Sequence, residues 1–138
     1  MSKIYEAILE VLEEQNLSIR DIENSKIFGD KTTYNFSQEN PSLKSLMKLA
    51  NYLKVSIDYL LGFSDKNSFK EYNIENINFN KNLREIIHNE KISMKQMAGD
   101  LKMGETNFVR WNRGVYPRLD KLVDIANYLK CSIDDLLL

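Results

Sequence analysis

Apolar residues recur along the chain in two blocks with helical spacing. Each block opens with apolar positions at i, i+4, i+7 and i+8, which predicts a helix with one buried face. These positions are Ile4, Ile8, Val11 and Leu12 in the first block, and Phe79, Leu83, Ile86 and Ile87 in the second. No segment alternates β-branched with polar residues, and no Asn-Gly turn is present, so strands are not expected. The pattern predicts an all-α protein.

One phrase occurs twice in nearly identical form. Residues 50–61 read ANYLKVSIDYLL and residues 126–137 read ANYLKCSIDDLL, which agree at ten of twelve positions with an offset of 76. Further upstream the offset is 75, as between Ser18 and Ser93, so the first copy lacks one residue. A one-residue gap in a loop costs little. We therefore interpret the chain as a tandem duplication.

The duplication predicts two helical domains, residues 1–62 and 78–138, joined by residues 63–77. The joining segment is polar and rich in Asn, which is typical of a linker. As a linker it has a flexible reach of roughly 20–25 Å. Alternatively, the segment forms a short helix that packs on one copy through its apolar residues, Phe69, Tyr72, Ile74 and Ile77.

Serines mark the predicted start of the second helix in each copy. Ser93 with Gln96 fits a capping box, in which each side chain bonds the backbone of the other residue, and Ser18 with Asp21 is a looser version. The second helix is therefore expected to begin just after these serines.

The fourth and fifth helices follow from a proline and another serine. Pro41 and Pro117 suit the first turn of the fourth helix, where a missing N–H does no harm. Ser56 and Ser132 are expected to cap a short fifth helix. Each copy thus contains five predicted helices.

Residues 93–114 of the second copy read as two short helices with a tight turn between them. Their apolar positions are Met97, Ala98, Leu101, Met103, Phe108 and Trp111. With Gly114, Pro117 and the repeated phrase, this run resembles the Cro/CI-type helix-turn-helix family, also called lambda-repressor-like or xenobiotic-response-element type. The resemblance covers all of the second copy and, less closely in its middle, the first. It implies an all-α fold of two tandem five-helix domains, and a transcriptional regulator, more commonly a repressor, that binds double-stranded DNA.

An α-helix fits the major groove, and its outer residues can reach base edges. The resemblance places Glu105, Thr106 and Arg110 at base-reading positions, and Val109 lies on the same side of the predicted helix. It places Asn107, Arg113 and Arg118 near the sugar-phosphate backbone. Ser93 and Lys95 are expected to contact phosphate at the start of the second helix. Met94 stands where the family often has a phosphate-binding Gln. Because Met cannot bind phosphate, Lys95 becomes more important for the expected phosphate contact.

Charge distinguishes the two copies. Residues 91–118 carry six basic and two acidic side chains, whereas the matched residues 16–42 carry three basic and four acidic ones. Because affinity depends on the number of phosphates neutralised, the second copy is expected to be the main reader. The first copy retains a weaker set, namely Lys31, Thr32, Tyr34 and Asn35.

Three residues of the first copy are more apolar than their counterparts. Tyr5, Leu9 and Tyr59 stand where the second copy has polar residues, which suggests a contact face for a homodimer or a protein partner. Isolated exposed aromatic residues are also common on protein surfaces that bind no partner. An alternative function is therefore a protein-binding helix-turn-helix module, like an antitoxin or a phage inhibitor of a host defence system, with or without autoregulatory DNA binding.

The composition narrows the other classes. The net charge is −1. Because the chain has only one His and one Cys, a zinc site with the usual His and Cys ligands is not expected. No nucleophile–base pair or phosphate loop is recognisable, so neither an enzyme nor a cofactor is expected. No apolar run reaches the length of a membrane span, and we expect a cytoplasmic protein. Trp111 and Cys131 are interpreted as packing residues, the latter because Val55 is its counterpart.

Overall fold

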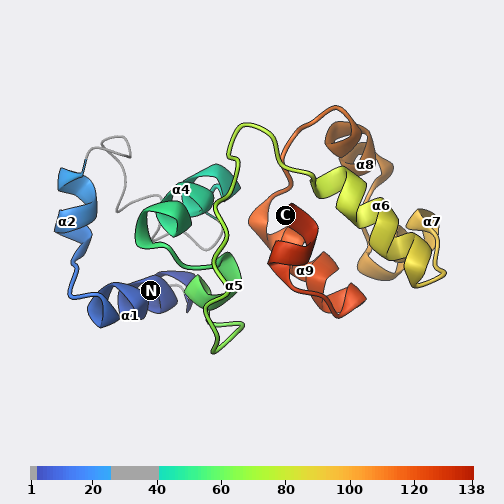
Figure 1. Ribbon diagram of the computed structural model, residues 1–138. Coiled ribbons are helices and arrows are strands. Elements are labelled where there is room, and N and C mark those ends of the chain that lie inside the picture. The colour runs from blue at the N-terminus through green and yellow to red at the C-terminus, as the bar shows by residue number, and fades with distance from the viewer. Residues whose placement is uncertain (1–2, 26–40) are drawn as a thin grey trace. The chain divides into compact units, whose positions relative to one another are not determined.

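The computed structural model describes residues 3–25 and 41–138 (Figure 1). All regular elements in these residues are helices, as predicted. The chain divides into two compact units, residues 1–71 and 72–138, which are described separately below. The predicted third helix of the first copy, with Lys31, Thr32, Tyr34 and Asn35, lies outside the described residues.

The N-terminal unit contains four helices within its described residues. They are α1 (Lys3–Glu14), α2 (Ile19–Asn24), α4 (Leu43–Leu53) and α5 (Ile57–Leu60). The predicted apolar stripe of α1 is buried at Ile8, Val11 and Leu12. The chain after α1 is tied to α4 because the Gln15 side chain donates to the Leu53 carbonyl at 3.0 Å. The core of this unit thus lies between α1, α4 and α5.

The C-terminal unit contains five helices, and all of its residues are described. They are α6 (Phe79–Asn89), α7 (Met94–Leu101), α8 (Glu105–Asn112), α9 (Leu119–Leu129) and α10 (Ile133–Leu137). Helix α10 packs on α6 and α9, and Asn82 of α6 donates to the Leu136 carbonyl at 3.1 Å. Trp111 is 5% exposed and fills the core as predicted.

The repeated phrase adopts the same backbone in both units. Lys54 and Lys130 end α4 and α9 in the left-handed region, with φ values of 57° and 56°. Ser56 and Ser132 then cap α5 and α10, confirming the predicted serine caps. The counterparts Val55 and Cys131 differ: Val55 is 2% exposed, but Cys131 is only half-buried, so its predicted packing role is weaker than that of Val55.

The predictions for the other helix starts need two corrections. The complete capping box is at Ser18 and Asp21, whereas at α7 only the Ser93 side chain bonds the Gln96 N–H. The shorter Asp side chain reaches back to the serine N–H, at 2.7 Å. Pro41 and Pro117 precede the N-cap residues Ser42 and Arg118 rather than lying in the first helical turn, because both helices begin two residues later.

Residues 63–77 are attached to the units at both ends and form no helix. Asn67 accepts from the Ser56 N–H at 2.9 Å and donates to the Lys54 carbonyl at 3.0 Å. These two bonds hold the first part of the segment against the N-terminal unit. Tyr72 is buried in the C-terminal unit, where its hydroxyl donates to the Asp134 carboxylate. The alternative of a short helix in this segment is therefore wrong, although its four apolar residues are buried or half-buried.

Candidate nucleic-acid interface

Helices α7 and α8 are joined by a tight turn of three residues. Lys102 ends α7 with a φ of 55°, and Met103, whose N–H bonds the Ala98 carbonyl at 2.9 Å, is buried. Gly104 then precedes α8 as an extended N-cap residue. The left-handed residue ends the first helix, and the buried methionine fixes the direction in which the second begins.

One side of α8 is fixed to the core of the C-terminal unit. Trp111 meets Phe79 of α6 and Phe108 edge to face, each with ring centroids 5.2 Å apart. Asn80 of α6 donates to the side-chain oxygen of Asn112 at 3.1 Å. These contacts fix the rotation of α8 about its axis, so the opposite side of this helix is presented to solvent.

The opposite side of α8 carries a stripe of four exposed residues. Thr106, Val109, Arg110 and Arg113 are spaced at i, i+3, i+4 and i+7, which places them on one helix face. Glu105 is also exposed, at the start of α8. The predicted base-reading residues therefore lie together on the free face of this helix. Asn107 is half-buried and lies off the stripe.

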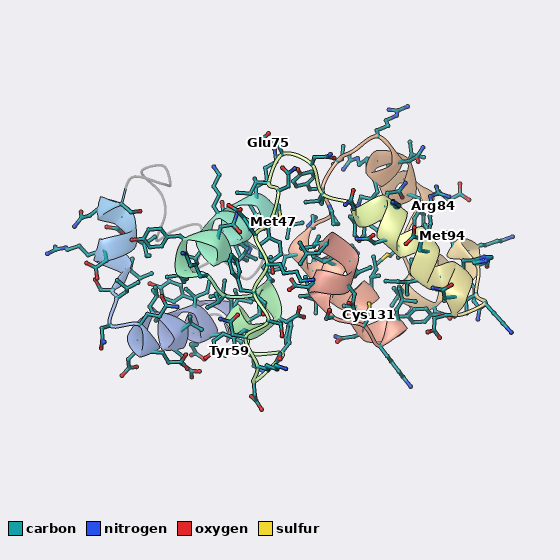
Figure 2. All side chains as sticks on the ribbon, viewed as in Figure 1. Met47, Tyr59, Glu75, Arg84, Met94 and Cys131 are labelled. Atoms are coloured by element: carbon teal, nitrogen blue, oxygen red, sulfur yellow. The ribbon has the colours of Figure 1, made fainter. Side chains whose placement is uncertain are left out.

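The other predicted backbone-contacting residues lie at helix starts. Ser93 caps α7, and Lys95 is exposed in its first turn. Met94, labelled in Figure 2, is the half-buried first residue of α7. Arg118 is the N-cap residue of α9 and makes no capping bond; its guanidinium lies 3.3 Å from the Asp120 carboxylate. All cations in this set are exposed to solvent.

Two residues that the sequence did not suggest hold α7 in place. The hydroxyl of Tyr128 on α9 donates to the carboxylate of Asp100 on α7 at 2.5 Å. This bond, followed by partial burial and the carboxylate charge, raises the pKa of Tyr128 above its ordinary value of 10.0. No local pattern links residues 28 positions apart, so only the fold could reveal this contact.

The predicted contact face of the N-terminal unit is less exposed than its sequence suggested. Tyr5, Leu9 and Tyr59 are all half-buried. Tyr59, labelled in Figure 2 near α1, donates to Glu14 at 2.6 Å, and this bond chiefly raises its pKa. The charge of residues 3–25 is more distinctive, because the two exposed basic side chains there are outnumbered by exposed acidic ones. The acidic residues are Glu6, Glu10, Glu13, Glu14, Asp21 and Glu23.

Neither a metal-binding cluster nor a membrane-spanning helix is present in the part of the chain that the structure describes. Residues 3–25 and 41–138 contain no group of three or more His, Cys, Asp or Glu side chains that could hold a metal ion. In the same residues no helix combines the length and apolar character that crossing a membrane requires. The exposed face of α8 and its neighbouring cations are thus the most distinctive feature of the C-terminal unit.

Comparison with known proteins agrees with this location. No curated protein and no solved structure shows a significant match to the chain. Residues 82–137 match the family model of the Cro/C1-type HTH DNA-binding domain, which spans all of α7 to α10 and most of α6. Over these residues the C-terminal unit is therefore similar to a Cro/C1-type HTH DNA-binding domain, a similarity that points to DNA binding.

Proposed function

We propose that this protein is a sequence-specific regulator of transcription that binds double-stranded DNA, most simply as a repressor. Its α8 helix is placed in the major groove. One observation carries the proposal: the exposed stripe of α8 faces away from the core within a region matched by a DNA-binding family model. A helix of this diameter fits the major groove of B-DNA, where side chains on its outer face meet base edges.

Three residues of the stripe, together with Glu105, have chemistry that complements the base edges. Arg110 can donate two hydrogen bonds to O6 and N7 of a guanine, and Glu105 can accept one from a cytosine amino group. Thr106 and Val109 can contact the methyl group of a thymine. Arg110 is the residue from which we expect the largest contribution to sequence preference, because its planar guanidinium forms a bidentate pair.

Contacts with the DNA backbone are assigned to residues around α8. Ser93 and Lys95 at the start of α7 meet a phosphate, helped by the partial positive charge of the helix N-terminus. The incomplete capping box at α7 supports this role, because Gln96 does not occupy the Ser93 N–H as Asp21 occupies that of Ser18. Asn107, Arg113 and Arg118 are assigned to the flanking sugar-phosphate positions.

Fluorescence anisotropy with duplexes selected from a random pool tests this function. Each phosphate neutralised contributes about −0.9 to the slope of log K against log salt, so several backbone contacts predict a steep slope. A binding curve that is independent of salt, or no binding to any duplex below about 10 µM at low salt, would contradict the proposal.

The N-terminal unit is proposed to be a degenerate copy of the same domain. Support comes from the matching left-handed residues Asn16 and Lys91 after the first helices, and from the matching ends of α4 and α9. Within residues 3–25, exposed acidic side chains outnumber exposed basic ones, which opposes a strong contact with phosphates. We propose that this unit contributes little to DNA affinity.

The acidic character of the N-terminal unit favours a second candidate function, protein binding through that unit. A homodimer or another protein would then meet α1, where Tyr5 and Leu9 are half-buried. Sedimentation of the wild type and of a Tyr5→Ser, Leu9→Ser variant tests this. A wild-type dimer that becomes a folded monomer supports the contact, with circular dichroism as the control for folding. A monomeric wild type that captures no protein contradicts it.

A further inference from the structure

Seven helices in the described residues end with the same backbone arrangement. A residue with positive φ is followed by a residue whose N–H bonds the carbonyl five positions back. This arrangement places the second residue beside the last turn of its helix, where an apolar contact usually forms. The second residue is apolar in every case: Leu17, Val55, Phe63, Ile92, Met103, Val115 and Cys131.

Exposure separates two of these residues from the others. Five are buried or half-buried, whereas Phe63 is 57% exposed and Val115 is 50% exposed. Val115 therefore buries less of its side chain in the core than five of its six equivalents do. Val109, on the outer stripe of α8, is also 50% exposed. Two apolar residues near the end of α8 thus leave about half of their side-chain surface in contact with water.

The backbone around Val115 is held in place. Its N–H bonds the Arg110 carbonyl at 3.0 Å, after a sharp turn at Gly114 with a φ of 90°. On the other side, the Tyr116 hydroxyl donates to the Ile74 carbonyl, and Pro117 is buried. Val115 is thus presented from a fixed loop at the end of α8.

The residues around this loop are cationic. Arg110, Arg113 and Arg118 are exposed within five residues of Val115. An apolar surface surrounded by arginines complements a polyanion that also offers an apolar group, rather than an apolar protein surface. In the major groove, the C5 methyl of thymine is that group.

We propose that Val115 and Val109 together bind the methyl group of a thymine next to the base pair contacted by Arg110. This inference rests on the proposed DNA-binding function and adds to it a residue outside the reading helix. It makes Val115 a specificity-determining residue that selects an A·T pair at one position. The neighbouring arginines supply affinity without reading that position.

Replacing thymine by deoxyuridine removes only the methyl group and so tests the contact directly. The full chain is titrated with its selected duplex, in which thymines are replaced one at a time. Because burying one methyl-sized group stabilises by about 0.8 kcal/mol, one replacement should weaken wild-type binding about fourfold. The Val115→Ser variant, which removes both γ-methyl groups, should bind the two duplexes within about twofold of each other.

Two controls separate this contact from general effects. Leu138→Ser removes another partly exposed apolar side chain, 41% exposed, and should keep the fourfold discrimination. Thermal unfolding of Val115→Ser should be close to that of the wild type, because the side chain of Val115 is 50% exposed.

The possible outcomes are distinct. If the wild type binds its selected duplex with sequence preference but no uracil replacement weakens binding, the methyl contact is overturned while the DNA-binding function stands. If the discrimination persists in Val115→Ser, Val115 does not make the contact. If no duplex binds, the proposed function itself fails, and this inference fails with it.

Discussion

Tyr128 of α9 donates a 2.5 Å hydrogen bond to Asp100 of α7, and the N-terminal unit has no equivalent bond in its described residues. Tyr52, the counterpart of Tyr128, is exposed on α4. At the position matching Asp100 stands Ser25, whose hydroxyl donates to the nearby Ile22 carbonyl at 2.6 Å. Among the described residues, this tyrosine–carboxylate bond between the second and fourth helices is thus a feature of the C-terminal unit.

This bond predicts a loss of stability at high pH. The Asp100 carboxylate raises the pKa of Tyr128 in the folded protein, so the folded state holds this proton more tightly than the unfolded state does. The contribution is complete below the unfolded pKa of about 10 and is lost as pH rises through the higher folded value. Urea unfolding of Tyr128→Phe should therefore show a smaller decrease in stability above pH 10 than the wild type. Tyr52→Phe, the matched control, should follow the wild type.

The two capping arrangements predict a substitution with opposite effects on folding and binding. Gln96→Asp should complete at α7 the box that Ser18 and Asp21 form at α2. The free energy of unfolding should rise by about 0.5–1 kcal/mol. DNA affinity should fall roughly tenfold, because the carboxylate competes with phosphate for the helix start and repels it.

Gln96→Ala is the control for this substitution, since it removes the amide without adding a charge. It should change DNA affinity by less than Gln96→Asp does. Thermal unfolding and anisotropy on the same samples give both quantities. An Asp variant that is stabilised but binds DNA as well as the wild type would remove the start of α7 from the proposed interface.

Arg118 offers a second comparison within the chain. It is the uncapped N-cap residue of α9, whereas Ser42 at the matching position caps α4 through the Ser45 N–H. Arg118→Ser should raise the free energy of unfolding by about 1 kcal/mol. It should also weaken binding to all duplexes alike and reduce the salt slope by about one. Unchanged affinity in this more stable variant would show that Arg118 does not contact the DNA backbone.

Two glycines near α8 should respond differently to alanine. Gly114 has a φ of 90°, where a Cβ is strained, although nothing lies within 4 Å of that Cβ. Gly114→Ala should therefore lower the free energy of unfolding by about 1 kcal/mol. Gly99, inside α7, has the same open surroundings and no positive φ, so Gly99→Ala should instead raise it by about 0.5–1 kcal/mol. Chemical denaturation distinguishes the two, and equal losses would contradict the backbone explanation.

Local patterns predicted the helices well because local chemistry determines them. The serine caps of α5 and α10 and the buried stripe of α1 follow from neighbouring residues, and the structure confirms them. The capping boxes were assigned the wrong way round, because a box depends on whether the side chain reaches back to the serine. That is a matter of side-chain length and rotamer, which the residue pattern does not contain.

The long-range contacts could not be predicted from the sequence. Asn67 and Tyr72 bind the joining segment to the two units through partners 11 or more residues away, and a polar composition gives no sign of this. The exposed side of α8 was predicted from the inward positions of Phe108 and Trp111, and the structure places it there. The exposure of Val115 could not be predicted, because five of the six equivalent residues at other helix ends are buried or half-buried. The roles of these residues toward DNA stay predictions.

The central claim is that α8 reads base sequence while α7 holds phosphate, and one paired titration tests it most directly. Arg110→Ala and Lys95→Ala are each titrated with the selected duplex and with a scrambled duplex at fixed salt. The account predicts that Arg110→Ala reduces the ratio of the two affinities by roughly 5- to 150-fold, as expected for loss of a bidentate base contact. Lys95→Ala should weaken both duplexes alike and leave that ratio unchanged. An Arg110→Ala variant that keeps the wild-type ratio would contradict the claim.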